Sequence, residues 1–518
     1  MKIYKNAEFI SCEDNNRIFS ILIEDKGKII FSGNNIPDKY EKIESIDLGG
    51  KCVVPAFGDT HIHFESFSFF HSGLDCRNAT DLDSLQKLIR EYVSNHPDEK
   101  IVLGFGCAAQ GAYEGKLLTR FDLDKITSIP VMLVKYDGHA SVANSSLIQK
   151  LPKKVLQDKG FNKDTGWFYQ DAFYQATNSI TSSIPITKVI KNMINGADFL
   201  AKKGIGFVHT VEGVGFPLDI DIDMMRLSSL WLPQKFRIYF QTMNLNKVIF
   251  RGLPCVGGCF ATALDGCFGS EDAALKDSYT NNPNNYGVLF YSQDKVNNFV
   301  KSANRKGLQV SLHAVADRAI EQAINAYESA LSDLRREDPR HIVIHADLMN
   351  KEMIEKASKL GLYFAVQTPF LMWKEEPVEY LEKILGDRLN NMIPLKSMID
   401  AGLILGNGSD GPCTIPDPIM GIYAACNHPN SSESISPLNA LKMHTNWASK
   451  LSFDEKERGT LTDGKCADFV ILDKNPLNFP VEKLDTIKVE KLYLKGEEYT
   501  GDSGNIFKFI FDAIKNKL

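Results

Sequence analysis

The sequence predicts an α/β fold, a distorted (β/α)8 barrel of the TIM type with a small β-sandwich built from both chain ends. The first observation is a regular alternation of apolar strands and helical segments that sets in at about residue 186. Strict alternation favours a parallel sheet, and the number of repeats suits a closed barrel of eight strands. The second observation is that strand patterns of one type occur near both chain ends. The third is a set of histidines and an aspartate at the ends of apolar strands.

The two chain ends are expected to form one sheet structure. About the first 50 residues alternate in polarity and are punctuated by Gly, Asn and Asp, which is typical of short antiparallel strands. So few residues bury little apolar surface by themselves, and the matching strands lie at residues 465–473 and 491–496. The expected division is a β-sandwich from residues 1–53 and 453–500, a barrel from residues 54–70 and 186–452, and a C-terminal amphipathic helix at residues 501–518.

A pair of histidines, His61 and His63, follows an apolar run at residues 53–57. Side chains on a strand repeat their facing every two residues, so both imidazoles point the same way and Ile62 points to the other side. Two imidazoles on one strand make half of a zinc-type coordination sphere. A pair of ordinary structural histidines is the alternative, but the buried-strand pattern before the pair favours the metal site.

Three further polar residues end apolar strands: His313, His345 and Asp410. The two histidines are about one βα unit apart. In a barrel, the C-terminal strand ends converge on one face, which is where active sites are found. A lone strand-end His or Asp is often only a cap or a loop anchor. Several of them after a His-x-His pair favour one shared site.

Composition excludes several classes of protein. With 518 residues, 43% hydrophobic and 24% charged, the chain is typical of globular proteins and long enough for a barrel with additions. The net charge of −6 and the lack of a basic block argue against nucleic-acid binding. No run of about 18 apolar residues could span a membrane, and no charged-then-apolar leader opens the chain. We expect a cytoplasmic protein whose ten scattered cysteines are reduced.

The order His61-x-His63, His313, His345 and Asp410 resembles the amidohydrolase superfamily of metal-dependent hydrolases. Within it, the chain resembles the branch that includes N-substituted formamide deformylases. The matching stretches are residues 135–140, 312–319, 408–412 and 463–473. The resemblance implies a barrel with a β-sandwich, an insertion over the barrel mouth at residues 71–185, and hydrolysis of an amide or other non-peptide C–N bond in a small molecule.

The resemblance also implies one or two divalent metal ions, zinc or a similar ion. Many relatives bridge two metals with a carboxylated lysine, but Ala261 stands where that lysine aligns, so the bridging carbamate cannot form. Glu212, just past an apolar strand, is expected to replace it; Lys135 is a weaker candidate because it lies in the insertion. The expected metal ligands are His61, His63, Glu212, His313, His345 and Asp410.

The implied mechanism is metal-assisted hydrolysis, in which a metal lowers the pKa of its bound water. Asp410 is expected to take the proton and deliver it to the departing amine, while His345 or the metal holds the oxyanion. Tyr136, His139 and Asp317 are expected to bind substrate, although the Asp-Gly-His loop could equally be a structural turn.

Two other functions remain open. A deaminase with a single metal is favoured by the missing lysine at position 261. A catalytically silent regulatory protein on the same fold is disfavoured, because Asp410 and the four histidines are all present, whereas a lapsed enzyme is free to lose the proton-transfer aspartate. The substrate is expected to be a small molecule, with no nucleic-acid or membrane partner, and a homodimer is one option for the oligomeric state.

Overall fold

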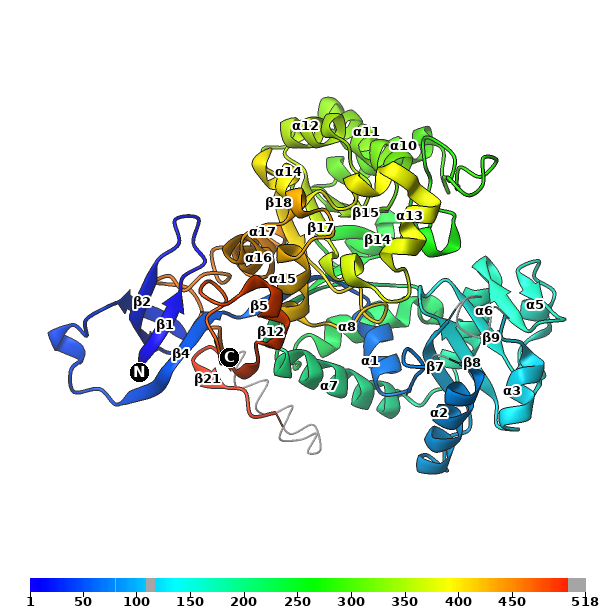
Figure 1. Ribbon diagram of the computed structural model, residues 1–518, viewed down its shortest axis with the longest axis horizontal. Coiled ribbons are helices and arrows are strands. Elements are labelled where there is room, and N and C mark those ends of the chain that lie inside the picture. Colours follow the sequence, from blue (N-terminus) through cyan, green and yellow to red (C-terminus); the bar gives the residue numbers. More distant parts are fainter. Residues whose placement is uncertain (80, 109–116, 502–518) are drawn as a thin grey trace.

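The computed structural model describes residues 1–79, 81–108 and 117–501, which form three β-sheets and the helices around them (Figure 1). The central sheet has eight strands in the order β18-β17-β16-β15-β14-β13-β12-β5, and all its paired neighbours run parallel. Its strands are β5 (Phe57–Ile62), β12 (Ile205–Glu212), β13 (Lys235–Phe240), β14 (Cys255–Ala263), β15 (Gln309–Ala314), β16 (Ile342–His345), β17 (Tyr363–Val366) and β18 (Ile404–Asn407).

The central sheet nearly closes into a barrel, because the chain just after β18 returns to β5. The backbone N–H of Asp410 donates to the carbonyl of His61 at 2.8 Å, and the N–H of His63 donates to the carbonyl of Gly411 at 2.9 Å. The predicted distorted barrel is therefore confirmed.

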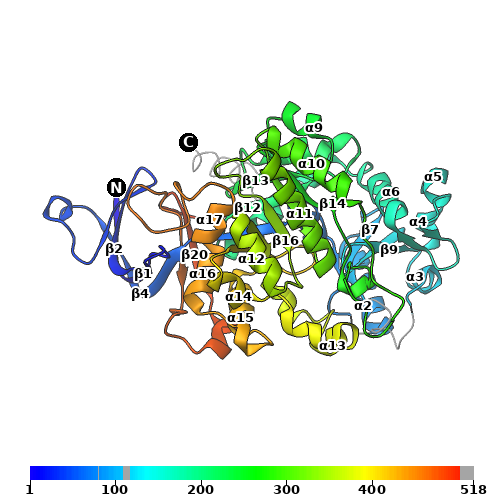
Figure 2. The same cartoon turned by 90° about the horizontal axis from the view of Figure 1, so that it is seen from above.

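Helices cover the outside of the barrel. They are α1 (Phe64–His71), α7 (Ile186–Lys202), α8 (Ile220–Ser228), α9 (Leu245–Phe250), α10 (Gln293–Arg305), α11 (Asp317–Asp333), α12 (Lys351–Leu360), α13 (Val378–Leu385), α14 (Leu395–Asp400), α15 (Pro418–Cys426), α16 (Pro437–His444) and α17 (Asn446–Leu451). Seen from above, α10, α11 and α12 lie side by side along one flank of the barrel (Figure 2). Among the residues described, no helix is both long and apolar enough to cross a membrane.

Local signals set the ends of these helices. The side chain of Asn350 accepts a hydrogen bond from the N–H of Met353 at 3.0 Å and so caps the start of α12. Gly361 ends the same helix with a φ of 64°, a left-handed conformation that glycine adopts without strain. The buried residues of α12, among them Met353 and Ile354, pack on the barrel core. Capping and an apolar face thus fix both the length and the orientation of the helix.

The second sheet joins the two chain ends in the order β21-β20-β19-β4-β1-β2-β3. Its strands are β1 (Lys2–Ile10), β2 (Ile18–Asp25), β3 (Lys28–Gly33), β4 (Ser45–Pro55), β19 (Phe469–Leu472), β20 (Val489–Leu494) and β21 (Glu497–Glu498). The sheet folds over, since the N–H of Ile29 donates to the carbonyl of Lys465 at 2.8 Å. Between its halves Phe469 packs on Tyr4 and Tyr493, with ring centroids 5.1 and 4.5 Å apart. The predicted sandwich from both ends is therefore confirmed, as one continuous folded sheet.

The third sheet lies at the far side of the barrel from the chain ends (Figure 1). Its order is β10-β11-β9-β8-β7-β6, from β6 (Leu74–Asp75), β7 (Val102–Cys107), β8 (Val131–Lys135), β9 (Ala140–Ala143), β10 (Phe161–Asn162) and β11 (Trp167–Tyr169). Its helices are α2 (Leu82–Asn95), α3 (Arg120–Ile126), α4 (Ser145–Ile148), α5 (Lys153–Leu156) and α6 (Gln170–Thr181). The domain boundaries given above stay a prediction, and of the expected C-terminal helix residues 502–518 lie outside the described part.

Candidate metal centre

His61 lies at the C-terminal end of β5 and His63 directly follows the strand, and both are buried, at 1% and 7% exposure. Their rings lie 5.5 Å apart between centroids. The carboxylate of Asp410 lies between them, with its Oδ1 3.1 Å from His61 Nε2 and 3.3 Å from His63 Nε2. This oxygen is buried and makes no hydrogen bond of good geometry. Three potential ligand atoms therefore converge on one point, as they do around a metal ion.

Cys259, on β14, completes this arrangement. Its Sγ lies 3.3 Å from His61 Nε2 and 3.7 Å from His345 Nε2. Two groups of potential ligands share it: one is His61, His63, Cys259 and Asp410, and the other is Cys259, His313 and His345. Within each group the ligand atoms lie within 4.8 Å of one another. The sulfur is thus placed to contact both groups.

A bulge in β14 positions the Cys259 side chain. Gly257 and Gly258 have φ values of 112° and 126°, which L side chains rarely adopt, and a Cβ on Gly257 would collide with the carbonyl of Ser311. The pairing of β14 with β15 shifts register between Gly258 and Ala263. After the bulge, Cys259 points at His61 and His345. Ala261, aligned with the bridging lysine, instead accepts a hydrogen bond from the Tyr291 hydroxyl through its carbonyl at 3.0 Å.

His345 ends β16 and is oriented by Gln367. Its Nδ1 lies 2.6 Å from Gln367 Oε1, and Gln367 Nε2 donates to the carbonyl of Ala365 at 3.0 Å, which fixes the amide orientation. The proton is therefore assigned to Nδ1, which leaves the Nε2 lone pair facing Cys259. His345 and Asp410 both have left-handed backbones, with φ of 68° and 53°, an uncommon conformation that clusters at functional sites.

His313 is the penultimate residue of β15, and its ring meets that of His345 at 80° with centroids 4.5 Å apart. Its Nε2 lies 3.3 Å from the carbonyl of Gly266, while its Nδ1 is buried without a hydrogen-bond partner. A buried ring nitrogen with a free lone pair is costly unless something binds it. Nδ1 of His313 is therefore the atom available to a metal.

The protonation states also suit a metal. Burial lowers the pKa of His61, lowers that of His345 to about 3 and lowers that of His313 well below its usual range, so these rings are neutral at pH 7. Burial alone would raise the pKa of Asp410, but contacts with His61 and His63 hold it well below its usual range. Burial and the Asp410 charge raise the pKa of the Cys259 thiol, which a bound metal would oppose.

This donor set fits a divalent ion. Neutral imidazoles, a carboxylate and a cysteine sulfur are the ligands that zinc takes in proteins. The buried atoms without partners, Nδ1 of His313 and Oδ1 of Asp410, are the ones that an ion would satisfy.

The structure corrects the bridging role expected of Glu212. Along β12, Val211 packs inside the barrel with Tyr239 and Ile344, so the alternating Glu212 faces outward. Its Oε1 accepts hydrogen bonds from the N–H of Glu65 at 3.1 Å and from the Thr210 hydroxyl. Neither group of potential ligands contains Glu212. The facing of a strand residue, rather than its distance along the chain, decides this outcome.

Aromatic side chains surround the mouth above the centre. The ring centroid of Phe260 lies 5.0 Å from that of His63 and 5.5 Å from that of Tyr174, a residue of α6. On the other side, Phe370 stacks on Trp373 with centroids 4.8 Å apart and lies 6.1 Å from His345. Aromatic rings thus pack on both sides of the centre, and their apolar surface favours exclusion of water during a reaction.

The predicted substrate residues divide between two places. His139 lies 5.7 Å from Phe260, and Tyr136 meets Trp373 edge-on at 5.3 Å, so both belong to the aromatic mouth. Asp317 lies at the start of α11, where its Oδ1 accepts hydrogen bonds from the N–H groups of Lys276 and Arg318, each at 2.9 Å. Those contacts anchor the loop before α11, and the expected role of Asp317 in substrate binding stays a prediction.

Sequence reasoning missed Cys259 and Gln367. Both carried a usable signal. Cys259 lies on the same strand as Ala261 and two residues before it, so on a regular strand both side chains would face the same side. Gln367 directly follows the apolar strand β17 (Tyr363–Val366), the same type of position as that of the predicted site residues.

Comparison with known proteins identifies the family. The sequence model described as the amidohydrolase family matches residues 44–499. The chain belongs to the amidohydrolase family. One relative, YtcJ of Bacillus subtilis (strain 168), which is named as an amidohydrolase, is 25% identical over 94% of this chain and 96% of its own length. The N-substituted formamide deformylase of Arthrobacter pascens is 23% identical over 88% of this chain and 89% of its own.

Solved structures give the same fold. An uncharacterized metal-dependent hydrolase from Pyrococcus furiosus superposes with a TM-score of 0.75 at 24% identity and covers 92% of this chain and 100% of its own. At this level of identity the likeness speaks for the fold. The family match is what supports a metal-dependent hydrolase.

Proposed function

We propose that this amidohydrolase cleaves an amide or another non-peptide C–N bond of a small molecule with the help of one or two divalent ions, zinc being the best fit. The observation that carries the proposal is the convergence of His61, His63 and Asp410 on one point, with Cys259 shared with the second histidine pair. The printed name of the Arthrobacter pascens relative supports formamides as the first compounds to test.

Two ion positions follow from the two ligand groups. One would be held by His61, His63 and Asp410, the other by His313 and His345, with Cys259 between them. Two cations close together repel each other, so an anionic ligand between them is needed. The Cys259 sulfur would supply that charge as a thiolate, in place of the carboxylated lysine that Ala261 rules out.

When bound, the metal would lower the pKa of a coordinated water towards about 7. Asp410 is the proton carrier: its carboxylate accepts a proton from the attacking water and later gives it to the departing nitrogen. His139 and Tyr136 orient the substrate from the aromatic mouth, where the apolar walls also keep bulk water away.

The test combines metal analysis with a substrate screen. The purified protein should contain one to two equivalents of zinc or a similar ion, and formamides, N-acyl amino acids and cyclic amides should be screened for hydrolysis. Chelation should abolish hydrolysis and added metal should restore it. Full activity in a verified metal-free sample would contradict the proposal.

The number of bound metal ions also distinguishes the proposed hydrolase from a single-metal deaminase. One firmly bound ion, together with release of ammonia from an amino-substituted ring, would favour the single-metal deaminase. Two ions that are both lost when Cys259 is replaced would favour the shared thiolate.

A further inference from the structure

Three buried carboxylates lie together outside the metal centre. Glu65 comes from α1, Glu212 from β12 and Asp221 from α8, and they are only 4%, 3% and 1% exposed. Among the described residues, no Lys, Arg or His forms an ion pair with any of them. Buried carboxylates without a cation are costly, because burial removes water and each charge repels the others.

Hydrogen bonds satisfy only part of this group. Asp221 Oδ2 accepts from the N–H groups of Gly213 and Gly215 at 2.9 and 3.0 Å, whereas its Oδ1 is buried without a partner. Glu212 accepts from Thr210 and from the backbone of Glu65. The Glu65 carboxylate receives no hydrogen bond from any residue in the described part of the chain. It is thus an acceptor on a buried side chain that no described residue satisfies.

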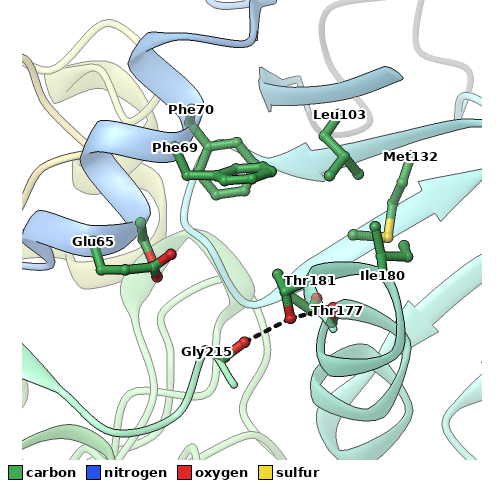
Figure 3. A pocket seen from close by; sticks show the side chains of 10 residues that line it. Glu65, Phe69, Phe70, Leu103, Met132, Thr177, Ile180, Thr181 and Gly215 are labelled. Carbon is green, nitrogen blue, oxygen red and sulfur yellow. Dashed lines mark hydrogen bonds between the residues drawn. The ribbon is translucent and has the colours of Figure 1, made fainter. Parts of the chain in front are cut away.

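The Glu65 side chain extends from α1 into a cavity between α1, α6 and the third sheet (Figure 3). At the other wall stand Phe69 and Phe70 of α1, Leu103 of β7 and Met132 of β8. Figure 3 shows both phenyl rings and the Met132 sulfur turned towards the same space. The cavity therefore has an apolar wall and one acidic end.

The acidic end also carries neutral oxygen acceptors. The Thr181 hydroxyl donates to the carbonyl of Gly215 at 2.8 Å, which draws the 213–216 loop against α6 (Figure 3). The Thr177 hydroxyl, on the same lining, is buried without a partner. An ammonium group with three N–H donors could meet the Glu65 carboxylate and one or two of these oxygens at once.

We propose that this cavity binds a small organic cation, a primary alkylammonium, with its nitrogen at Glu65 and its alkyl chain against Phe69, Phe70 and Leu103. A bare inorganic cation would need several oxygen ligands in place of the phenyl and aliphatic wall. An alkylammonium matches both parts, because its charge meets the carboxylate and its chain meets apolar carbon. The site is separate from the metal ligands, and its occupation is independent of whether the chain hydrolyses a C–N bond.

The experiment is a calorimetric titration of the metal-loaded full-length protein with n-butylammonium at about pH 9, below the usual pKa of about 10.4 for such amines. We expect saturable binding of one equivalent. The neutral isostere n-butanol should bind at least about tenfold more weakly, which corresponds to ~1.4 kcal/mol. Glu65→Gln should weaken n-butylammonium by a similar factor, whereas Glu352→Gln, an exposed residue on α12, should leave it unchanged.

A second variant covers the case in which Glu65→Gln does not fold. Phe70→Ala shortens the apolar wall and should weaken n-butylammonium and n-butanol alike, by several-fold. No saturable binding to the wild type, equal binding of n-butanol, or unchanged binding in Glu65→Gln would overturn the proposal. Displacement of n-butylammonium by an equal concentration of sodium or potassium would also overturn it, because the site would then be one for inorganic ions. None of these readouts uses hydrolysis, so the proposed function can fail while the cation site stands.

Discussion

Gln367 Oε1 lies 2.6 Å from Nδ1 of His345, and this contact decides which nitrogen of the ring faces Cys259. Gln367 does not point at the shared centre itself. It holds the imidazole in one tautomer and one orientation, as the outer partners of metal-binding histidines commonly do.

Replacing Gln367 by Leu keeps the volume but removes the acceptor. The His345 ring then loses its fixed tautomer, and we expect metal affinity to fall by about 10–100-fold, measured by competition with a chelator. Gln322→Leu is the control, because that buried glutamine of α11 bonds to the carbonyl of Tyr291 instead. Equal losses in both variants would mean that Gln367 supports the fold in general and not His345.

Replacing Asp410 by Asn keeps the shape but removes the proton acceptor. Turnover of any substrate found should fall by roughly 10²-fold or more, the usual scale for general acid–base assistance. Metal content should fall less, since His61 and His63 remain. Steady-state kinetics with metal analysis of the same sample tests this, and normal turnover would show that another residue carries the proton.

Cys259 and Glu212 form a matched pair of variants. Cys259→Ser removes the sulfur that both ligand groups share and should lower the metal content by at least one equivalent, with loss of most activity. Glu212→Gln should leave the metal content unchanged, because that side chain faces Glu65 and Thr210 on the outside of β12. Metal analysis of the two proteins decides between them. The reverse outcome would restore Glu212 as the bridging ligand.

The stability of the fold should depend on pH through His341, a buried residue remote from the centre. Its Nδ1 accepts from the N–H of Val310 at 3.1 Å, and burial followed by the Arg336 charge lowers its pKa to about 3. The unfolded chain, with a pKa of about 6.5, therefore binds a proton first as the pH falls. The stability that neutral His341 contributes is complete above about pH 6.5 and is lost towards pH 3, at up to about 1.4 kcal/mol per pH unit.

His341→Gln should accordingly be less stable than the wild type at about pH 7, with a gap that narrows between about pH 6.5 and 4. Urea denaturation at several pH values measures this. His96→Gln, at an exposed position, should give a curve parallel to that of the wild type. A gap of constant size for His341→Gln would mean that the residue is not held neutral in the folded protein.

The fold and much of the centre could be predicted from the sequence because both depend on short-range rules. The alternation of strands and helices predicts a parallel barrel, and parallel strands bring their C-terminal ends to one face. His61, His63, His313, His345 and Asp410 all follow apolar strands, so the same rule brings them together before any contact is known. The matching strand patterns at the two ends likewise predicted their pairing, which β4 and β19 make.

Tertiary structure alone decided which side chains face inward and what lies opposite them. Alternate residues of a strand point to the same side of the sheet only while the strand is regular. The bulge at Gly257 and Gly258 breaks that regularity in β14. As a result, the side chain of Cys259 points at His61 and His345. Glu212 is close to the centre along the chain but on the outer face of β12, where it meets Glu65. The aromatic mouth and the acidic cavity each join segments more than 80 residues apart, and such contacts arise only when the whole chain packs. Sequence patterns show only the local periodicity of a strand or helix. The register after a bulge, and which distant segments pack against each other, depend on the packing free energy of the complete fold.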